Sequence, residues 1–501
     1  MNSYDYIIVG GGTAGCVLAA RLSADPSVTV LLIEAGPAAA PAEAAQPPAW
    51  MTLLGGECDW RFSTTPQADA GVLGYPRGRM LGGSSGINAM MHLRGHRAGY
   101  DGWIKAGAPG WGYADLLPYF QRSERTEGRD PAVRGTSGPL RVAPASPGHP
   151  IARAFIQAAA QAGHQTSADL NGRDQAGAGW LDLNVVDGIR QSAADGYLRP
   201  VLDRPNLTVA TRGQALGLVV ENDRCTGVRY PHDGRLTEAR ALREVVLSAG
   251  AIGSPQLLML SGIGPAGQLR ELGIEVHADI PEVGANLQDH PLTALVFEVS
   301  REAPPGPNNN VEAIAALSSG LSGELTDVQL FLGTLPVNPP PVPTPSAGFS
   351  IGVSVTAPRS RGTVRLKSPA PEVPPLIDPR LLIDPRDLDV LDFGLQAART
   401  IAAAPALADW GSTEIFPAGL TPDAASRRAF LRQAVTGYFH PVGTCRLGSD
   451  PGSVLDLELR VRGIDGLRVA DASVMPAIPT ANTNATVLAI AERAADLITG
   501  R

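Results

Sequence analysis

The hydrophobic pattern of the first forty residues predicts a strand, a helix and a second strand in close succession. Residues 4–9 (YDYIIV) are rich enough in β-branched and apolar side chains for a buried parallel strand. Residues 14–24 (AGCVLAARLSA) favour a helix, and a second apolar run at 28–36 (VTVLLIEAG) ends near Glu34. This order is typical of a βαβ unit.

Further strand-like runs lie in the middle of the chain. They occupy residues 206–210, 215–220, 225–230 and 243–250, and we interpret them as a β-meander that returns to the parallel sheet before residue 250. Near the C-terminus, apolar residues recur at helical spacing, which predicts an amphipathic helix over residues 485–498.

A glycine motif connects the first strand to the first helix. Gly10, Gly12 and Gly15 satisfy the GxGxxG pattern, in which the glycines permit a tight turn, a close approach to a pyrophosphate and close helix–strand packing. A pyrophosphate would meet the free N–H groups of the helix N-terminus. Glu34 can accept hydrogen bonds from ribose hydroxyls and would repel a 2′-phosphate, which disfavours NADP. The motif alone does not distinguish FAD from NAD.

Four later segments carry the same kind of signal. Residues 77–97 (RGRMLGGSSGINAMMHLRGHR) contain Gly82, Gly83 and Ser84, whose backbone and hydroxyl donors suit a phosphate or the edge of a flavin. Residues 250–264 (GAIGSPQLLMLSGIG) follow a strand-like run. The segments YFHPVGTCRLG and VADASVMPAIPTANTN precede the C-terminal helix.

With these blocks in order, and with NLQDHP between them, the chain resembles the glucose-methanol-choline (GMC) oxidoreductases, flavoenzymes that act on alcohols. The resemblance covers nearly the whole chain, although residues 300–350 carry no family motif. It implies an α/β fold with a Rossmann-like FAD-binding domain over 1–150, 196–290 and 435–501. A second α+β substrate domain with an antiparallel sheet would take residues 151–195 and 291–434.

The resemblance also implies a set of FAD-contacting residues beyond the glycine motif. Ile87 stands where some relatives have a histidine that binds FAD covalently, so we expect non-covalent FAD. The C-terminal helix would direct its N-terminus at the flavin and stabilise negative charge there. Together with Glu34 and the glycines already named, the expected contacts are Thr13, Ala14, Ala35, Arg79, Asn88, Ala89, Ala215, Ala249, Asp471, Ala472, Thr483 and Asn484.

Catalysis would use a histidine and an asparagine. Oxidation of an alcohol needs a base for the hydroxyl proton, and an imidazole is suited to that role near neutral pH. His440 occupies the position of the family's catalytic histidine, and Asn482 the position of its second catalytic residue, whose amide can hydrogen-bond the substrate oxygen. For His290, in NLQDHP, a structural hydrogen-bonding role is favoured over catalysis.

The substrate is less well defined by the sequence. We expect Val353, Ser354, Val355, Tyr438 and Phe439 to line the substrate cavity, since they flank or face motif positions. Small and apolar residues without a charged anchor favour an uncharged primary alcohol, aromatic or allylic, over choline or a sugar. The electron acceptor would be oxygen, a quinone or another carrier, with an oxidase slightly favoured. The run 336–345 (PVNPPPVPTP) is interpreted as an access loop or a surface connection.

Composition limits the other functions. The net charge of -8 argues against nucleic acid and anionic membranes as partners. Four dispersed cysteines indicate neither a metal site nor disulfides, and no apolar run is long enough to span a bilayer, so a cytoplasmic protein is expected. A flavin-containing hydroxynitrile lyase remains an alternative. A non-catalytic FAD module and an NAD-dependent dehydrogenase are disfavoured.

Overall fold

The first strand, β1 (Asn2–Val9), is an inner strand of a parallel arrangement at the N-terminal end of the molecule. The computed structural model describes residues 2–232, 234–301, 303–337, 344–417, 419 and 423–500. Within them, β1 pairs in parallel with β2 (Val30–Ile33) and β16 (Arg235–Leu247). The predicted βαβ unit is confirmed.

The remaining strands of this seven-stranded sheet, as far as the chain is described, extend it on both sides. Two strands add in parallel, and two form an antiparallel meander with β16, as the sequence predicts. The parallel strands are β13 (Leu207–Ala210) beside β2 and β27 (Leu467–Val469) beside β16, and the meander is β14 (Gly217–Glu221) and β15 (Arg224–His232).

Two helices begin shortly after the carboxyl ends of strands of this sheet: α1 (Thr13–Leu22) follows β1, and α5 (Gly250–Leu260) follows β16. A third helix, α10 (Asn484–Thr499), follows β27 after a longer connection. The predicted C-terminal helix is therefore confirmed. The Thr13 hydroxyl donates to the Asn484 side-chain oxygen over 2.8 Å, which ties the N-termini of α1 and α10 together.

A second sheet, also seven-stranded in the described chain, is antiparallel in every pairing. It includes the region without a family motif. The strands, in spatial order, are β25 (Ser412–Phe416), β19 (Pro291–Val299), β22 (Gly348–Val355), β21 (Val328–Gly333), β20 (Val311–Leu317) and β9 (Gly177–Trp180), with β26 (Thr436–Gly437) beside β19.

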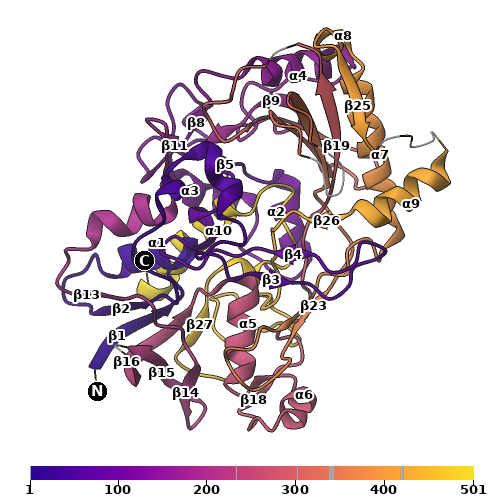
Figure 1. The fold of residues 1–501 in the computed structure, drawn as a ribbon. Helices are drawn as coiled ribbons and strands as arrows, with labels where there is room; N and C mark the ends of the chain where they lie inside the picture. The colour runs from indigo at the N-terminus through magenta and orange to yellow at the C-terminus, as the bar shows by residue number, and fades with distance from the viewer. Residues whose placement is uncertain are drawn as a thin grey trace.

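Helices cover one face of the second sheet. Leucines of α7 (Pro385–Ala402) pack on β22, and apolar residues of α4 (Pro150–Gln161) join the same core. Figure 1 shows the two sheets in opposite halves of the view, with α1 and α10 between them. The other α-helices in the described part of the chain are α2 (Arg97–Lys105), α3 (Tyr113–Ser123), α6 (Ala266–Glu271), α8 (Pro405–Ala408) and α9 (Ala424–Ala434).

The strands of the two sheets fall within the two sets of residue ranges expected for the domains, except that β26 lies just past residue 435. The division into two discontinuous domains stays a prediction. Residues 338–343 of the proline-rich run lie outside the described residues, so neither interpretation of that run is tested.

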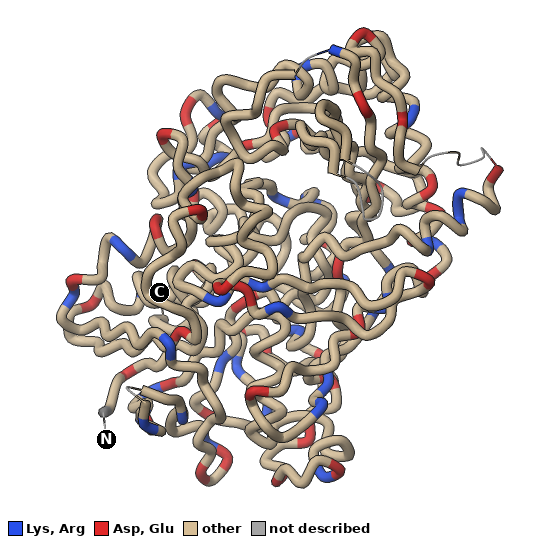
Figure 2. The backbone as a smooth tube through the Cα atoms, viewed as in Figure 1, with Lys and Arg blue, Asp and Glu red and all other residues tan. Residues whose placement is uncertain are grey.

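Basic and acidic residues are interspersed along the backbone rather than gathered on one side in Figure 2.

A buried ionic group lies beside β5 (Met91–His92). Glu124 accepts hydrogen bonds from Arg94 over 2.6 Å and from Arg134 over 2.8 Å, and all three side chains are inaccessible to solvent. Burial by itself would raise the pKa of Glu124, but the two guanidinium groups outweigh it and hold that pKa well below the usual range.

No described helix is both long and apolar enough to traverse a bilayer.

Replacing Gly15 by alanine tests the close helix–strand packing. A Cβ atom there would lie 1.9 Å from the Gly10 carbonyl oxygen, so backbone must move. We expect Gly15→Ala to lower the free energy of unfolding by about 1–3 kcal/mol in urea titrations. The matched control is Gly267→Ala in α6, where a Cβ would meet nothing within 4 Å and stability should be kept or slightly raised. Equal stability of the two variants would contradict the packing argument.

Candidate active site

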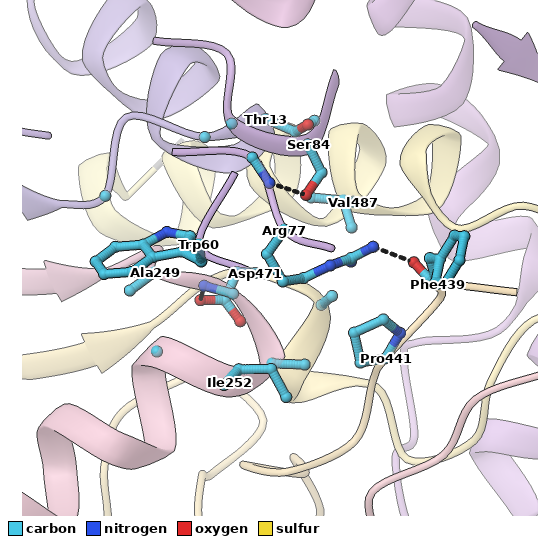
Figure 3. Close-up of a pocket in the computed structure, with 18 of the residues that line it drawn as sticks. Thr13, Trp60, Arg77, Ser84, Ala249, Ile252, Phe439, Pro441, Asp471 and Val487 are labelled. Carbon is cyan, nitrogen blue, oxygen red and sulfur yellow. Dashed lines mark hydrogen bonds between the residues drawn. The ribbon is translucent and has the colours of Figure 1, made fainter. Parts of the chain in front are cut away.

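A cavity of about 360 Å³ connects the glycine motif with His440 and Asn482. Its walls come from both sheets and from the N-termini of α1, α5 and α10. Figure 3 shows Thr13 and Ser84 on one side, Ala249 and Asp471 on another, and Phe439 and Pro441 at the far end.

Most residues predicted for the site line this cavity. Those that do are Gly10, Gly12, Thr13, Ala14, Glu34, Ala35, Gly83, Ser84, Asn88, Ala89, Ala215, Ala249, Tyr438, Phe439, His440, Asp471, Ala472, Asn482, Thr483 and Asn484. Six do not appear in its lining: Gly15, Arg79, Gly82, Val353, Ser354 and Val355. The roles of individual residues stay predictions, because a shared cavity shows proximity and not function.

The expectation for Val353, Ser354 and Val355 needs correction. The alternation of a strand turns Val353 and Val355 to the same face of β22, where both are fully buried in the core against α7. Ser354 lies on the other face, opposite Gln329 and Leu292 on the neighbouring strands, but it too is fully buried. Leu292 reaches the cavity in its place.

At the end of the cavity nearest the glycine motif, backbone donors are free to bind an anion. Gly12 caps α1 without a side-chain hydrogen bond, so the first N–H groups of the helix have no such partner. Gly83 approaches the same loop so closely that a Cβ on it would lie 2.7 Å from the Gly12 Cα. This surface of backbone without side chains fits a pyrophosphate.

Glu34, which the sequence predicts to bind ribose hydroxyls, also holds the glycine loop in place. Its carboxylate accepts hydrogen bonds from the N–H groups of Gly11, over 2.8 Å, and Gly36, over 2.7 Å. Burial raises the pKa of Glu34 to about 7. The Glu34 side chain therefore holds the glycine loop against the end of β2, and Glu34 also lines the cavity.

The opposite end of the cavity is formed by the segment Tyr438–His440, which follows β26. Asp289 holds it in place. One carboxylate oxygen of Asp289 accepts from the backbone N–H groups of His440 and His290, each over 2.8 Å, and the other accepts from the Tyr75 hydroxyl over 2.8 Å. Phe439 has a φ of +63°, a left-handed conformation that is unfavourable for a bulky residue and is maintained here by these contacts.

The ring of His440 contacts the other predicted catalytic residue. Its Nε2 atom lies 3.3 Å from Nδ2 of Asn482, and both residues line the cavity. Gln329 donates through its amide to the Asn482 oxygen over 3.3 Å, which directs the Asn482 NH₂ group at His440. Burial lowers the pKa of His440 well below its usual value, and the Arg77 charge acts in the same direction. The imidazole is therefore neutral and can act as a base.

Arg77 is a site residue that sequence reasoning missed. It lines the cavity, and its guanidinium donates to the backbone carbonyl of Phe439 (Figure 3). The guanidinium also donates to the backbone carbonyl of Pro76. No described carboxylate forms a salt bridge with it. The RGR start of its block was the available signal, but the pattern does not show which arginine reaches the cavity: Arg79 instead stacks on Trp60, 5.0 Å from the ring centre.

Apolar and aromatic side chains surround His440. The Tyr438 ring lies 4.4 Å from the His440 ring and stacks on Phe331 at 5.2 Å, and Met91 and Leu292 complete this part of the lining. Phe331, Met91 and Leu292 were not predicted, because they lie on separate strands whose pairing is not visible in the sequence.

Comparison with known proteins agrees with the geometry. The family model for GMC oxidoreductases matches residues 4–292 and 358–491. The chain is 38% identical to a mitochondrial choline dehydrogenase of Mus musculus over 100% of this chain and 90% of that protein. It is 37% identical to an alcohol dehydrogenase [acceptor] of Pseudomonas putida over 99% of this chain and 95% of that one. The crystal structure of pyridoxine 4-oxidase from Mesorbium loti has a TM-score of 0.95, at 36% identity, with 99% of each chain covered.

The chain therefore belongs to the GMC oxidoreductase family. It binds FAD and is an FAD-dependent oxidoreductase that acts on CH–OH groups. The relatives named here are oxidases and dehydrogenases, so the lyase alternative receives no support.

Glu34→Gln tests how the cofactor end is held. A glutamine keeps the size but presents an NH₂ group to one of two backbone donors, so one hydrogen bond to a charged group is lost. We expect FAD to bind about tenfold or more weakly, as measured by FAD retained during dialysis. The control substitution Glu43→Gln, at an exposed residue, should retain FAD fully.

Acid denaturation of the parent protein should release all flavin, because Ile87 stands at the position where some relatives have the histidine that binds FAD covalently. Flavin left on the protein would show a covalent bond.

Proposed function

We propose that this enzyme oxidises an uncharged primary alcohol, aromatic or allylic, to its aldehyde, with His440 as the base and oxygen as the electron acceptor. FAD, when bound, supplies the acceptor for the hydride that leaves the alcohol carbon. His440 Nε2 takes the hydroxyl proton, and the Asn482 NH₂ group stabilises the charge that develops on the oxygen. Their 3.3 Å separation lets one substrate oxygen contact both.

The charged side chains near His440 are the main support for an uncharged substrate. Arg77 places a guanidinium in this part of the wall. The acidic residues among the described lining are Glu34, at the glycine-loop end, and Asp471, whose oxygens already accept from Gly250, Ser254 and Ser473. A quaternary ammonium would therefore meet a cation and no free carboxylate near the reacting atoms.

The shape and chemistry of the wall favour a flat apolar substituent. Tyr438, Phe331 and Phe439 supply rings, and Met91 and Leu292 supply flexible apolar contacts. An aromatic ring next to the hydroxymethyl group would stack in such a lining. The pyridoxine 4-oxidase, similar over its whole length, is named for oxidation of an aromatic alcohol, which supports both the substrate class and oxygen as acceptor.

A cytoplasmic location stays a prediction. Four buried cysteines with free thiols are compatible with a reducing compartment.

Anaerobic reduction of the bound flavin by a panel of alcohols tests the proposal. We expect benzyl-type, pyridyl-methyl and allylic alcohols to bleach the yellow protein, and choline to do so at least about a hundredfold more slowly. Readmission of air should restore the colour rapidly. Preferential bleaching by choline would reject the substrate class and favour a choline dehydrogenase; slow recolouring would reject oxygen and favour a quinone or another carrier.

His440→Gln should slow bleaching by about 10²–10⁴-fold with an unchanged flavin spectrum. The control His164→Gln should leave the rate of bleaching unchanged.

The pH dependence of bleaching follows from the environment of His440. A base works only when deprotonated, so the rate falls as pH falls through the pKa of the base. Because burial depresses the pKa of His440 below the ordinary histidine value of about 6.5, we expect the reduction rate to stay level from pH 8 to below 6.5 and to decline only at lower pH. Stopped-flow reduction at saturating alcohol measures this, and a decline that begins above pH 7 would contradict it.

A further inference from the structure

The ring of His440 has a second nitrogen, and its partner is another histidine. Nδ1 of His440 lies 3.0 Å from Nδ1 of His290, with the two rings close to perpendicular at 85°. His290 immediately precedes β19 and is completely buried; it does not appear in the cavity lining. It therefore contacts the predicted base without reaching a substrate or cofactor.

The protonation of His290 is determined by its other nitrogen. Nε2 of His290 lies 3.0 Å from the carbonyl oxygen of Pro479, which can only accept, so Nε2 carries a hydrogen. The neighbouring groups do not favour a second proton. The Arg77 charge lies on the His440 side, and Asp289 directs its oxygens at backbone N–H groups and at Tyr75. Burial lowers the pKa of His290 to about 3, although the Pro479 and Thr356 carbonyls act the other way.

A neutral His290 with a hydrogen on Nε2 has a lone pair on Nδ1. Two imidazole nitrogens 3.0 Å apart need one hydrogen between them, and it must then come from His440. His440 is consequently protonated at Nδ1, and its lone pair is on Nε2, the atom that faces Asn482 and the cavity.

We propose that His290 is a positioning residue that selects the Nδ1–H tautomer of His440 and so places the basic lone pair on Nε2, where the substrate hydroxyl arrives. The proposal rests on the proposed function only in naming His440 as the base. The balance is simple: Nε2 gains the hydroxyl proton, Nδ1 keeps its own, and no proton leaves the pair.

The same contact affects the protonated state. Once His440 holds two hydrogens, the Nδ1–H group still donates to His290, and this bond becomes charge-assisted and stronger. His290 thus performs, as a neutral group, the orienting role that a carboxylate has in other catalytic histidines. Without an acceptor at this position, the Nε2–H tautomer competes and puts a hydrogen where the base is needed.

Three substitutions separate tautomer selection from a merely structural role. In His290→Asn, an amide oxygen can occupy the place of Nδ1 and accept from His440. In His290→Gln, the longer amide can reach Pro479, as Nε2 does, but offers no acceptor at the Nδ1 place. His290→Leu keeps the bulk and removes both contacts.

The first measurement is nitrogen NMR of the ¹⁵N-histidine-labelled, oxidised holoenzyme without substrate, with the His440 signals assigned by their loss in His440→Gln. We expect protonated Nδ1 and unprotonated Nε2 in the parent protein and in His290→Asn, and a shift toward Nε2–H in His290→Gln and His290→Leu. An Nε2–H tautomer in the parent protein, or no change in His290→Gln, would overturn the proposal; the parent spectrum decides even if a variant fails to fold.

The second measurement is anaerobic flavin reduction. We expect His290→Gln to slow reduction by about a hundredfold or more at saturating alcohol, with KM changed less than threefold and FAD content unchanged, and His290→Asn to recover most of the rate. Equal rates in the Asn and Gln variants would overturn the proposal. Full activity of His440→Gln would instead reject His440 as the base, while the NMR result on the tautomer would stand.

Discussion

The close approach of glycine backbones at the ends of β1 and β16 is the constraint on which the site depends. A Cβ on Gly10 would lie 2.6 Å from the Ser248 carbonyl oxygen, and one on Gly15 would lie nearer still to the Gly10 carbonyl. Only backbone fits there, so α1 starts directly at the sheet edge with its N–H groups exposed to the cavity. The hydrogen bond between Thr13 and Asn484 then sets the start of α10 at the same point. The positive ends of both helices therefore face one cofactor cavity.

The second sheet contributes the chemistry to that cavity through a short pairing of strands. β26 pairs with the start of β19, so the segments around His290 and His440 lie side by side although they are far apart in the sequence. Asp289 fixes the two segments by bonding both backbones. Its own pKa is raised to about 6 by burial, opposed by the Tyr75 hydroxyl and by those N–H groups. Because the Asp289 carboxylate accepts from two backbone N–H groups and from the Tyr75 hydroxyl, it positions the two segments and does not provide an anchor for a cationic substrate.

Local patterns in the sequence predicted much of the fold, and most of the residues that the family resemblance named line the cavity. The βαβ unit, the meander and α10 follow from hydrophobic periodicity, because each is formed by neighbouring residues. The errors arose where long-range pairing decides. Residues 353–355 lie in β22, and which face of that strand is covered depends on α7, a helix that begins thirty residues later. Leu292, Phe331 and Gln329 reach the site through cross-strand neighbours that no local pattern identifies. Arg77 was hidden in a motif that has two arginines.

The neutral state of the site follows from burial more than from any single partner. Burial disfavours a proton on either imidazole, and the Arg77 charge adds to that effect at His440. A base with so low a pKa holds a proton weakly, which would oppose catalysis if nothing favoured the charged form during the reaction. The lone pair of His290 provides that favourable contact at Nδ1, and the negative charge on the reacting oxygen provides it at Nε2. The site thus favours a charged His440 only while the substrate oxygen is itself charged. A neutral resting base and effective proton removal are therefore compatible in the same buried pair.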